Sequence, residues 1–143
     1  MTRAMIVLAM LATIGPDAAG DEPRADKTIE ITSKDGKLAF TEKGKEKAEA
    51  VTLVVGQTVR WRNKDSRPIR IVSAKKVDDS PIFDTGVIEP GAYKDLLIDI
   101  DLYSKAGGKR ASSVTVKYHD KGRDSDQAEL ELVSAARRGL GRR

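Results

Sequence analysis

The sequence contains no cysteine among its 143 residues. A chain without thiols forms no disulfide, thiolate metal site or iron–sulfur cluster, and it has no cysteine nucleophile. Aromatic residues are also few, with one Trp, three Tyr and two Phe, so Val, Ile and Leu must supply most of any core. The length, together with 34% charged and 39% hydrophobic residues, is typical of one globular domain and not of a disordered chain.

Long apolar runs are absent except at the N-terminus. Ala4–Ile14 is an apolar run interrupted only by Thr13, but its eleven residues are fewer than the roughly 20 that cross a bilayer. The run follows a basic start at residues 1–3 and precedes small residues at 18–20, which is the arrangement of a secretory signal peptide. We therefore expect cleavage near Gly20 to remove residues 1–20, with export to the periplasm or the cell exterior. The mature chain would then have no transmembrane segment.

Excess positive charge is confined to the C-terminus. The formal net charge is +4, and Arg3 and Asp17 cancel within the leader. Residues 21–136 contain 21 basic and 21 acidic side chains, so the excess lies entirely in the last seven residues. We expect residues 134–143 to form a basic tail, with an anionic surface or an unidentified protein as the partner. The candidate anion-binding residues in this tail are Arg137, Arg138, Arg142 and Arg143.

Short alternating segments follow a polar lead-in at residues 21–27, which we expect to be loose. Apolar and polar residues alternate with the period of half-buried strands, and Gly, Pro, Asn and Asp separate the segments. This spacing predicts one all-β domain over residues 28–133. We expect a Greek-key antiparallel β-sandwich of about seven or eight strands without a helix. The predicted strands include residues 28–32, 37–41, 51–55, 58–63, 68–74, 82–88, 114–118 and 128–132.

Three further local predictions concern the second half of the chain. Leu96, Ile98, Ile100 and Leu102 form the clearest alternation and predict another strand. Residues 104–112 contain two adjacent glycines and are expected to form a loop. Residues 118–127 are polar and are expected to form the loop before the last strand.

Three segments, taken in order, carry a resemblance to a known family. Val51–Asn63 is similar to a strand, a Gly-Asp-Thr-Val turn and a Trp-x-Asn strand, and Asn63–Pro68 is similar to an Asn-x-Asp-x-x-Pro turn. Phe83–Gly91 is similar to a Phe-Asp-Ser-Gly and Pro-Gly segment. In these motifs the chain resembles the cupredoxins, small Greek-key β-sandwiches that bind copper, in which the second segment leads to the first copper histidine. The resemblance covers residues 51–133 and implies a cupredoxin-like sandwich.

The family's copper ligands do not transfer to this sequence. Ile69 stands where the resemblance places the first histidine, and Tyr118 and Lys121 stand at the cysteine and second-histidine positions. Type 1 copper needs two histidines, a cysteine thiolate and a weak axial ligand. All three methionines lie in the leader, so the mature chain would retain His119 as its one histidine and no sulfur ligand. We expect no cofactor.

His119 and Asp120 form the remaining candidate metal site, a weak one. A histidine can bind a metal or titrate near neutral pH, but one imidazole does not make a metal site, and the alternative is a solvated loop histidine. Asp120, Asp124 and Asp126 do not have the spacing of an EF-hand loop.

Arg60, Arg62 and Arg70 are expected to form a basic stripe on one sheet face. Their candidate ion-pair partners across strands are Asp99, Asp101, Glu129 and Glu131, and a salt-bridged outer face is the favoured interpretation. Trp61 should point to the opposite face, so the stacking that single-stranded nucleic acids require is not indicated.

The sequence has no Gly-x-Ser-x-Gly elbow and no phosphate-binding loop, and so does not indicate an enzyme. These observations together predict an exported, non-enzymatic, cupredoxin-like binding or accessory module without a type 1 copper site. The alternative is a periplasmic metal-handling or electron-transfer cupredoxin with a degenerate site.

Overall fold

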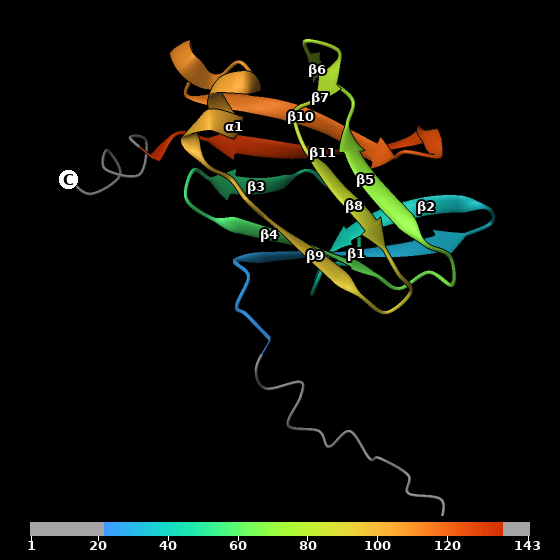
Figure 1. The fold of residues 1–143 in the computed structure, drawn as a ribbon. Helices are drawn as coiled ribbons and strands as arrows, with labels where there is room; N and C mark the ends of the chain where they lie inside the picture. The colour runs from blue at the N-terminus through green and yellow to red at the C-terminus, as the bar shows by residue number, and fades with distance from the viewer. Residues whose placement is uncertain (1–21, 136–143) are drawn as a thin grey trace, which may run out of the picture.

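Two β-sheets pack face to face in the computed structural model, which describes residues 22–135 (Figure 1). A four-stranded sheet has the order β2 (Lys37–Glu42), β1 (Lys27–Lys34), β4 (Thr58–Asn63) and β9 (Tyr93–Leu97). A five-stranded sheet has the order β3 (Val51–Val54), β11 (Arg123–Val133), β10 (Ser113–Asp120), β5 (Ile69–Ser73) and β8 (Asp84–Ile88). The remaining elements are the hairpin of β6 (Lys76–Val77) and β7 (Ser80–Pro81), the helix α1 (Ile100–Lys105) and the 3-10 turn η2 (Gly108–Arg110).

The all-β sandwich expected from the sequence is confirmed, with two differences in detail. The large sheets contain nine strands among the described residues, compared with the seven or eight expected. The pairs β1–β4 and β3–β11 are parallel, so the sheets are mixed and not antiparallel throughout. Both parallel pairs join strands that are not consecutive in the chain, because the chain crosses between the sheets before it returns.

Alternating side chains from both sheets fill the interior. Trp61 is fully buried, stacks on Phe83 at 5.5 Å between ring centroids, and meets the edge of Tyr118 at 5.5 Å. Phe40 meets Tyr118 at 5.2 Å, so four of the six aromatic residues form one central cluster. Burial strongly raises the pKa of the Tyr118 hydroxyl, which keeps this residue uncharged. Aliphatic residues surround the cluster: Ile29, Ile31, Leu53, Val59, Ile71, Ile88, Ile98, Leu130 and Leu132.

The turn between β1 and β2 follows directly from its sequence. Asp35 and Gly36 both have positive φ, at 54° and 76°. Two successive positive φ values define the type I′ turn, whose twist matches that of the flanking strands, and Asp-Gly is among the dipeptides that favour it.

The strand predicted through Leu102 is wrong beyond Leu97, where β9 ends and the chain turns into α1. The Asp99 carboxylate caps this helix by accepting the N–H of Leu102 at 2.7 Å. Leu102 is buried, whereas the side chain of Ile100 is 67% exposed, so the alternation does not correspond to one buried face. The predicted loop at 104–112 accordingly contains the end of α1 and η2.

The loop predicted at 118–127 is also wrong, because β10 and β11 run through most of it as an antiparallel hairpin. Asp120 pairs with Arg123, which leaves a two-residue turn at Lys121 and Gly122. Polar residues occupy these strand ends because the outer face of the sheet is in contact with water.

The lead-in is not loose where the structure describes it. The N–H of Asp26 donates to the carbonyl of Thr58 at 3.0 Å, and the N–H of Thr58 donates to the Asp26 carboxylate at 2.8 Å. Glu22 forms ion pairs with Arg60 and Arg62. The predicted leader at residues 1–20 and the four tail arginines lie outside the described residues. No helix within residues 22–135 is long and apolar enough to cross a membrane.

Candidate functional site

The loops at one end of the sandwich are joined by hydrogen bonds between polar side chains and backbone groups. The Asp120 carboxylate accepts the N–H of Arg70 at 3.0 Å, and the Asp126 carboxylate accepts the N–H of Leu38 at 3.0 Å. Arg123 donates to the carbonyl of Gly36 at 2.9 Å. Three separate segments, the β1–β2 hairpin, the start of β5 and the β10–β11 hairpin, are thereby held together. We call this region the loop end.

Asn63 connects two further turns to the loop end. Its fully buried amide donates to the carbonyls of Arg67 at 2.7 Å and Ile88 at 2.9 Å, and its side-chain oxygen accepts the N–H of Asp65 at 2.9 Å. The side chain therefore uses both donors and its acceptor. These bonds explain why the Asn-x-Asp segment identified in the sequence folds as a tight turn between β4 and β5.

The positions that the resemblance assigned to metal ligands do not converge. Ile69 is 3% exposed and packs in the core, while Lys121 is exposed at the tip of the β10–β11 hairpin and donates its N–H to the carbonyl of Arg70. Tyr118 is also buried, but it pairs with Ser73, four residues from Ile69 along β5. At about 3.3 Å per residue this offset is about 13 Å along the strand. A cavity of only about 70 Å³ remains beside Ile69.

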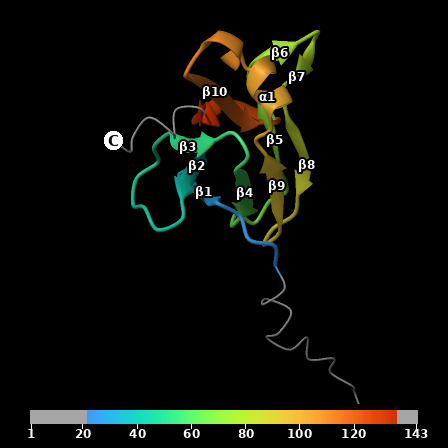
Figure 2. The same cartoon turned by 90° about the vertical axis from the view of Figure 1, so that its left-hand side faces the viewer.

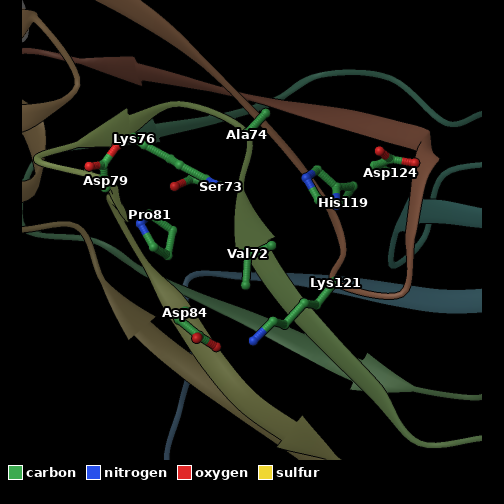
Figure 3. Close-up of a pocket in the computed structure, with 10 residues that line it drawn as sticks. All are labelled: Val72, Ser73, Ala74, Lys76, Asp79, Pro81, Asp84, His119, Lys121 and Asp124. Carbon is green, nitrogen blue, oxygen red and sulfur yellow. The ribbon is translucent and has the colours of Figure 1, made fainter.

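A groove of about 460 Å³ lies on the outer face of the five-stranded sheet, between the β6–β7 and β10–β11 hairpins. Figure 3 shows the residues that line it. His119 and Asp124 lie on one side of it, and Lys76 and Asp79 lie on the other (Figure 3). Its floor includes Val72, which is 7% exposed and pairs with His119 across β5 and β10. The lining residues are Val72, Ser73, Ala74, Lys76, Asp79, Pro81, Asp84, His119, Lys121 and Asp124.

His119 is a half-buried strand residue and not a loop residue. Its Nδ1 lies 2.8 Å from the backbone carbonyl of Asp120 and can bond to it only as an N–H donor. In the neutral ring this arrangement leaves the lone pair on Nε2. The ring therefore offers one acceptor atom.

His119 and Asp120 are adjacent in sequence but do not share a site. The Asp120 carboxylate accepts the Arg70 N–H and lines the cavity at the loop end, whereas His119 lines the groove on the outer face. Asp124 lines that groove, while Asp126 is engaged by the N–H of Leu38. Across residues 22–135, no three His, Asp or Glu side chains are placed to hold a metal ion together.

The predicted basic stripe is wrong, because its arginines belong to different sheets. Arg60 and Arg62 lie on β4 in the four-stranded sheet, and Arg70 lies on β5 in the five-stranded sheet. The predicted salt-bridged outer face is present, but with other partners. Arg60 pairs with Asp95 and Arg70 pairs with Asp84.

The hydrogen bond from Arg70 is the largest influence on Asp84 and lowers the pKa of this carboxyl, with partial burial acting in the opposite direction. Asp84 is at the same time part of the groove lining, where Lys121 extends toward it (Figure 3). The charge of Asp84 in the groove wall is therefore balanced by Arg70.

Comparisons with known proteins agree with the two-sheet architecture. No protein-family model matches the sequence, and no curated protein matches it. Among solved structures, a Cu(I) form of an amicyanin mutant superposes with a TM-score of 0.53 at 13% identity, covering 80% of this chain and 88% of the other. A reduced form of another amicyanin mutant gives a TM-score of 0.53 at 12% identity with the same coverage. The chain has a cupredoxin-like fold.

A purple cupredoxin from Nitrosopumilus maritimus is also similar, at 18% identity, covering 75% of this chain and 99% of the other with a TM-score of 0.49. At these identities the likeness concerns the cupredoxin fold alone, because sites evolve independently of the fold that carries them.

The residues present do not fit a type 1 copper ion in this cupredoxin fold. The copper plane requires a cysteine thiolate, and the chain has no cysteine. The buried apolar side chain of Ile69 stands at the position that the resemblance assigns to the first histidine. The one histidine, His119, lines a groove on the outer face of the sheet.

Sequence reasoning did not identify Glu22, Tyr93 and Asp95, which surround the two arginines of β4. The Arg60 guanidinium carbon lies 3.9 Å from the centre of the Tyr93 ring, and that of Arg62 lies 5.2 Å from it. Asp95 is 35 residues from Arg60 in the chain, so no local pattern could have paired them. Only the register between β4 and β9 brings these residues together.

Proposed function

We propose that this protein is an exported, non-enzymatic binding or accessory module. Its cupredoxin-like domain presents the loop end, whose segments are held together by hydrogen bonds, to a partner. The observation that carries this proposal is the loop end itself. Ile69, at the position that the resemblance assigns to the first copper histidine, is buried and apolar, and Asp120, Asp126 and Arg123 join the surrounding loops by hydrogen bonds. Rigid loops held by a scaffold are the usual location of binding surfaces.

The non-enzymatic part of the proposal is supported by the residues of the groove on the outer face of the five-stranded sheet. Ser73 is its one hydroxyl-bearing residue, and this hydroxyl donates to the carbonyl of Lys75 at 2.9 Å. It also accepts the N–H of Ile82 at 2.6 Å. A nucleophilic serine needs a hydrogen bond to a base, and this one is 2% exposed and engaged by backbone groups.

Calorimetric titration with Cu(II) and with Zn(II) tests whether the protein lacks a tight metal site. We expect no tight one-to-one binding of either ion. A tight 1:1 complex that is lost in His119→Ala would instead support the metal-handling alternative, and Lys76→Ala, on the opposite side of the same groove, is the matched control.

Export is supported by the basic start, short apolar run and small residues of positions 1–20. Sequencing the N-terminus of the protein from the exported fraction tests it, with a start near Asp21 expected. Retention of Met1 on an exported protein would contradict the signal peptide.

The basic tail offers a second way to bind a partner, because no acidic residue follows Glu131 and four arginines do. Binding to an anionic polymer would weaken steeply with salt. Deleting residues 137–143 should abolish such binding, and binding that survives the deletion would have to come from the folded domain.

A further inference from the structure

Arg60 is a buried arginine on the outer face of a sheet. Its neighbour Trp61 points into the core, so Arg60 points outward from β4, yet it is only 5% exposed. Its cover consists of Tyr93 on β9 and the lead-in segment that precedes β1.

Groups on the sheet itself orient the arginine. Asp95 on β9 accepts two hydrogen bonds from Arg60, from Nε at 2.7 Å and from Nη2 at 2.8 Å. Tyr93, also on β9, lies against both Arg60 and Arg62. Because β4 and β9 are paired strands, Arg60 is held by Asp95 whether or not the lead-in is present. Arg62 has the Tyr93 ring beside it on the sheet at 5.2 Å, and its ion pair is with Glu22 of the lead-in.

The lead-in meets these arginines in the way a bound peptide would. The Glu22 carboxylate forms a close ion pair with Arg62 and lies 3.5 Å from Nη1 of Arg60. The backbone carbonyl of Pro23 accepts from Nη2 of Arg60 at 2.5 Å. One acidic side chain and one backbone carbonyl thus make the contacts, and Pro23 and Arg24 remain exposed.

The lead-in is attached weakly before Asp26 and firmly at Asp26. Residues 22–25 contribute no buried apolar side chain to the core, so polar contacts alone hold Glu22 and Pro23. Asp26 is tied to Thr58 by two hydrogen bonds. The segment before Asp26 can therefore lift from the arginines while Asp26 stays in place.

We propose that Arg60, Arg62 and Tyr93 form a binding site for an extended acidic peptide of a partner protein, which the chain's own Glu22-Pro23 segment occupies. Arg60 and Arg62 are opposed by Asp95, and Glu30, which stands beside Arg62 across β1 and β4, is paired with Lys64, so the site is net positive, as an acidic ligand requires. The intramolecular segment competes at an effective concentration in the millimolar range. A partner peptide must therefore displace it, and the lead-in acts as a built-in competitor.

The test measures binding of a fluorescein-labelled peptide with the sequence of residues 21–26 to the full chain by fluorescence anisotropy. Glu22→Gln weakens the internal competitor, and we expect the peptide to bind this variant roughly three- to tenfold more tightly than the wild type. Adding Arg62→Gln to that variant should weaken binding at least about tenfold. A peptide with Gln in place of its Glu should bind poorly to all of them.

Arg70→Gln in the Glu22→Gln background is the matched control, because Arg70 is an ion-paired arginine on the outer face of the other sheet. It should leave peptide affinity unchanged. The proposal is overturned if Glu22→Gln shows no saturable binding, or if Arg62→Gln and Arg70→Gln weaken it equally. In either case the contacts would serve only to fasten the N-terminus.

Proteolysis of the wild type gives a second readout that does not depend on a variant folding. Trypsin cleaves after the exposed Arg24, and a lifted lead-in should be cleaved faster. A saturating peptide in which Arg24 is replaced by Gln, and which trypsin therefore does not cut, should accelerate cleavage there but not after Lys47, in the exposed loop before β3. Equal rates at Arg24 with and without peptide would contradict displacement.

Discussion

Arg60 and Asp95 form a bidentate ion pair across β4 and β9, in which Nε and Nη2 of the arginine lie 2.7 and 2.8 Å from the two carboxylate oxygens. The pair connects residues 35 positions apart and lies beneath the lead-in. The two hydrogen bonds form because the planar guanidinium matches the carboxylate geometry.

Asp95→Asn should lower the free energy of unfolding by about 1–3 kcal/mol, because it neutralises the bidentate partner of a largely buried guanidinium and leaves it only the longer contact with Glu22, at 3.5 Å. Urea denaturation followed by Trp61 fluorescence measures the change. Asp101→Asn is the control, since Asp101 is exposed and pairs only with Lys105 one helical turn away, and no measurable change is expected there. Equal losses of stability in the two variants would mean that the buried pair of Arg60 and Asp95 contributes no more to stability than an exposed ion pair.

Asn63→Leu should cost about 2–3 kcal/mol, because it leaves the carbonyls of Arg67 and Ile88 without their donors. The loss should appear as a lower midpoint in urea with an unchanged dependence on denaturant. Gln127→Leu provides a comparison at an exposed amide and should stay within about 0.5 kcal/mol of the wild type. A similarly small effect at Asn63 would contradict its role in holding the two turns.

Stability should fall at acid pH in part through Asp84, whose pKa is lowered from 3.8 mainly by the hydrogen bond from Arg70. A carboxyl with a lowered pKa in the folded state stabilises the protein fully above its ordinary pKa, and this contribution is lost as the pH falls through the folded value. Unfolding measured between about pH 6 and pH 2 should therefore show a shallower acid decline for Asp84→Asn than for the wild type. Identical slopes would show that the Arg70 contact does not favour the ionised carboxyl.

Asp99→Ala should destabilise the protein by about 1 kcal/mol, because it removes the side-chain cap of α1. Thermal unfolding monitored by circular dichroism detects such a change. Asp101→Ala lies in the first turn of the same helix without capping it, and so separates capping from the loss of charge. If both variants melt alike, the bond from Leu102 to Asp99 does not determine where β9 gives way to the helix.

Local patterns predicted most of the strands because each depends only on neighbouring residues. Val59 and Trp61 alternate with Arg60 and Arg62, and the observed β4 has the predicted bounds. The Asp35-Gly36 turn can be predicted from the sequence in the same way, because few other residue pairs adopt two successive positive φ values.

The prediction at 96–102 was wrong for an identifiable reason. Alternation of Leu96, Ile98, Ile100 and Leu102 is compatible with a strand, but Asp99 can accept an N–H three residues later and start a helix. Capping outweighs alternation here because the chain must turn at the end of β9. Ile100 is consequently exposed in spite of its apolar side chain.

The side chains of adjacent residues can lie in different sites when the residues are on a strand, as His119 and Asp120 show. Interpreted as part of a loop, the two side chains were expected to lie together, whereas on β10 one lines the outer groove and the other the loop-end cavity. The rule that successive side chains point to opposite faces would have separated them, had the segment been interpreted as a strand.

The sequence by itself determined that this cupredoxin-like chain cannot form a copper–thiolate bond, because composition does not depend on how the chain folds and no cysteine is present. Only the tertiary structure decided that Arg60 would be buried against Asp95 and Tyr93 beneath the lead-in, and that Arg70 would lie on the other sheet. These relationships depend on strand order and register, which arise from the packing of distant segments and leave no mark on the neighbouring sequence.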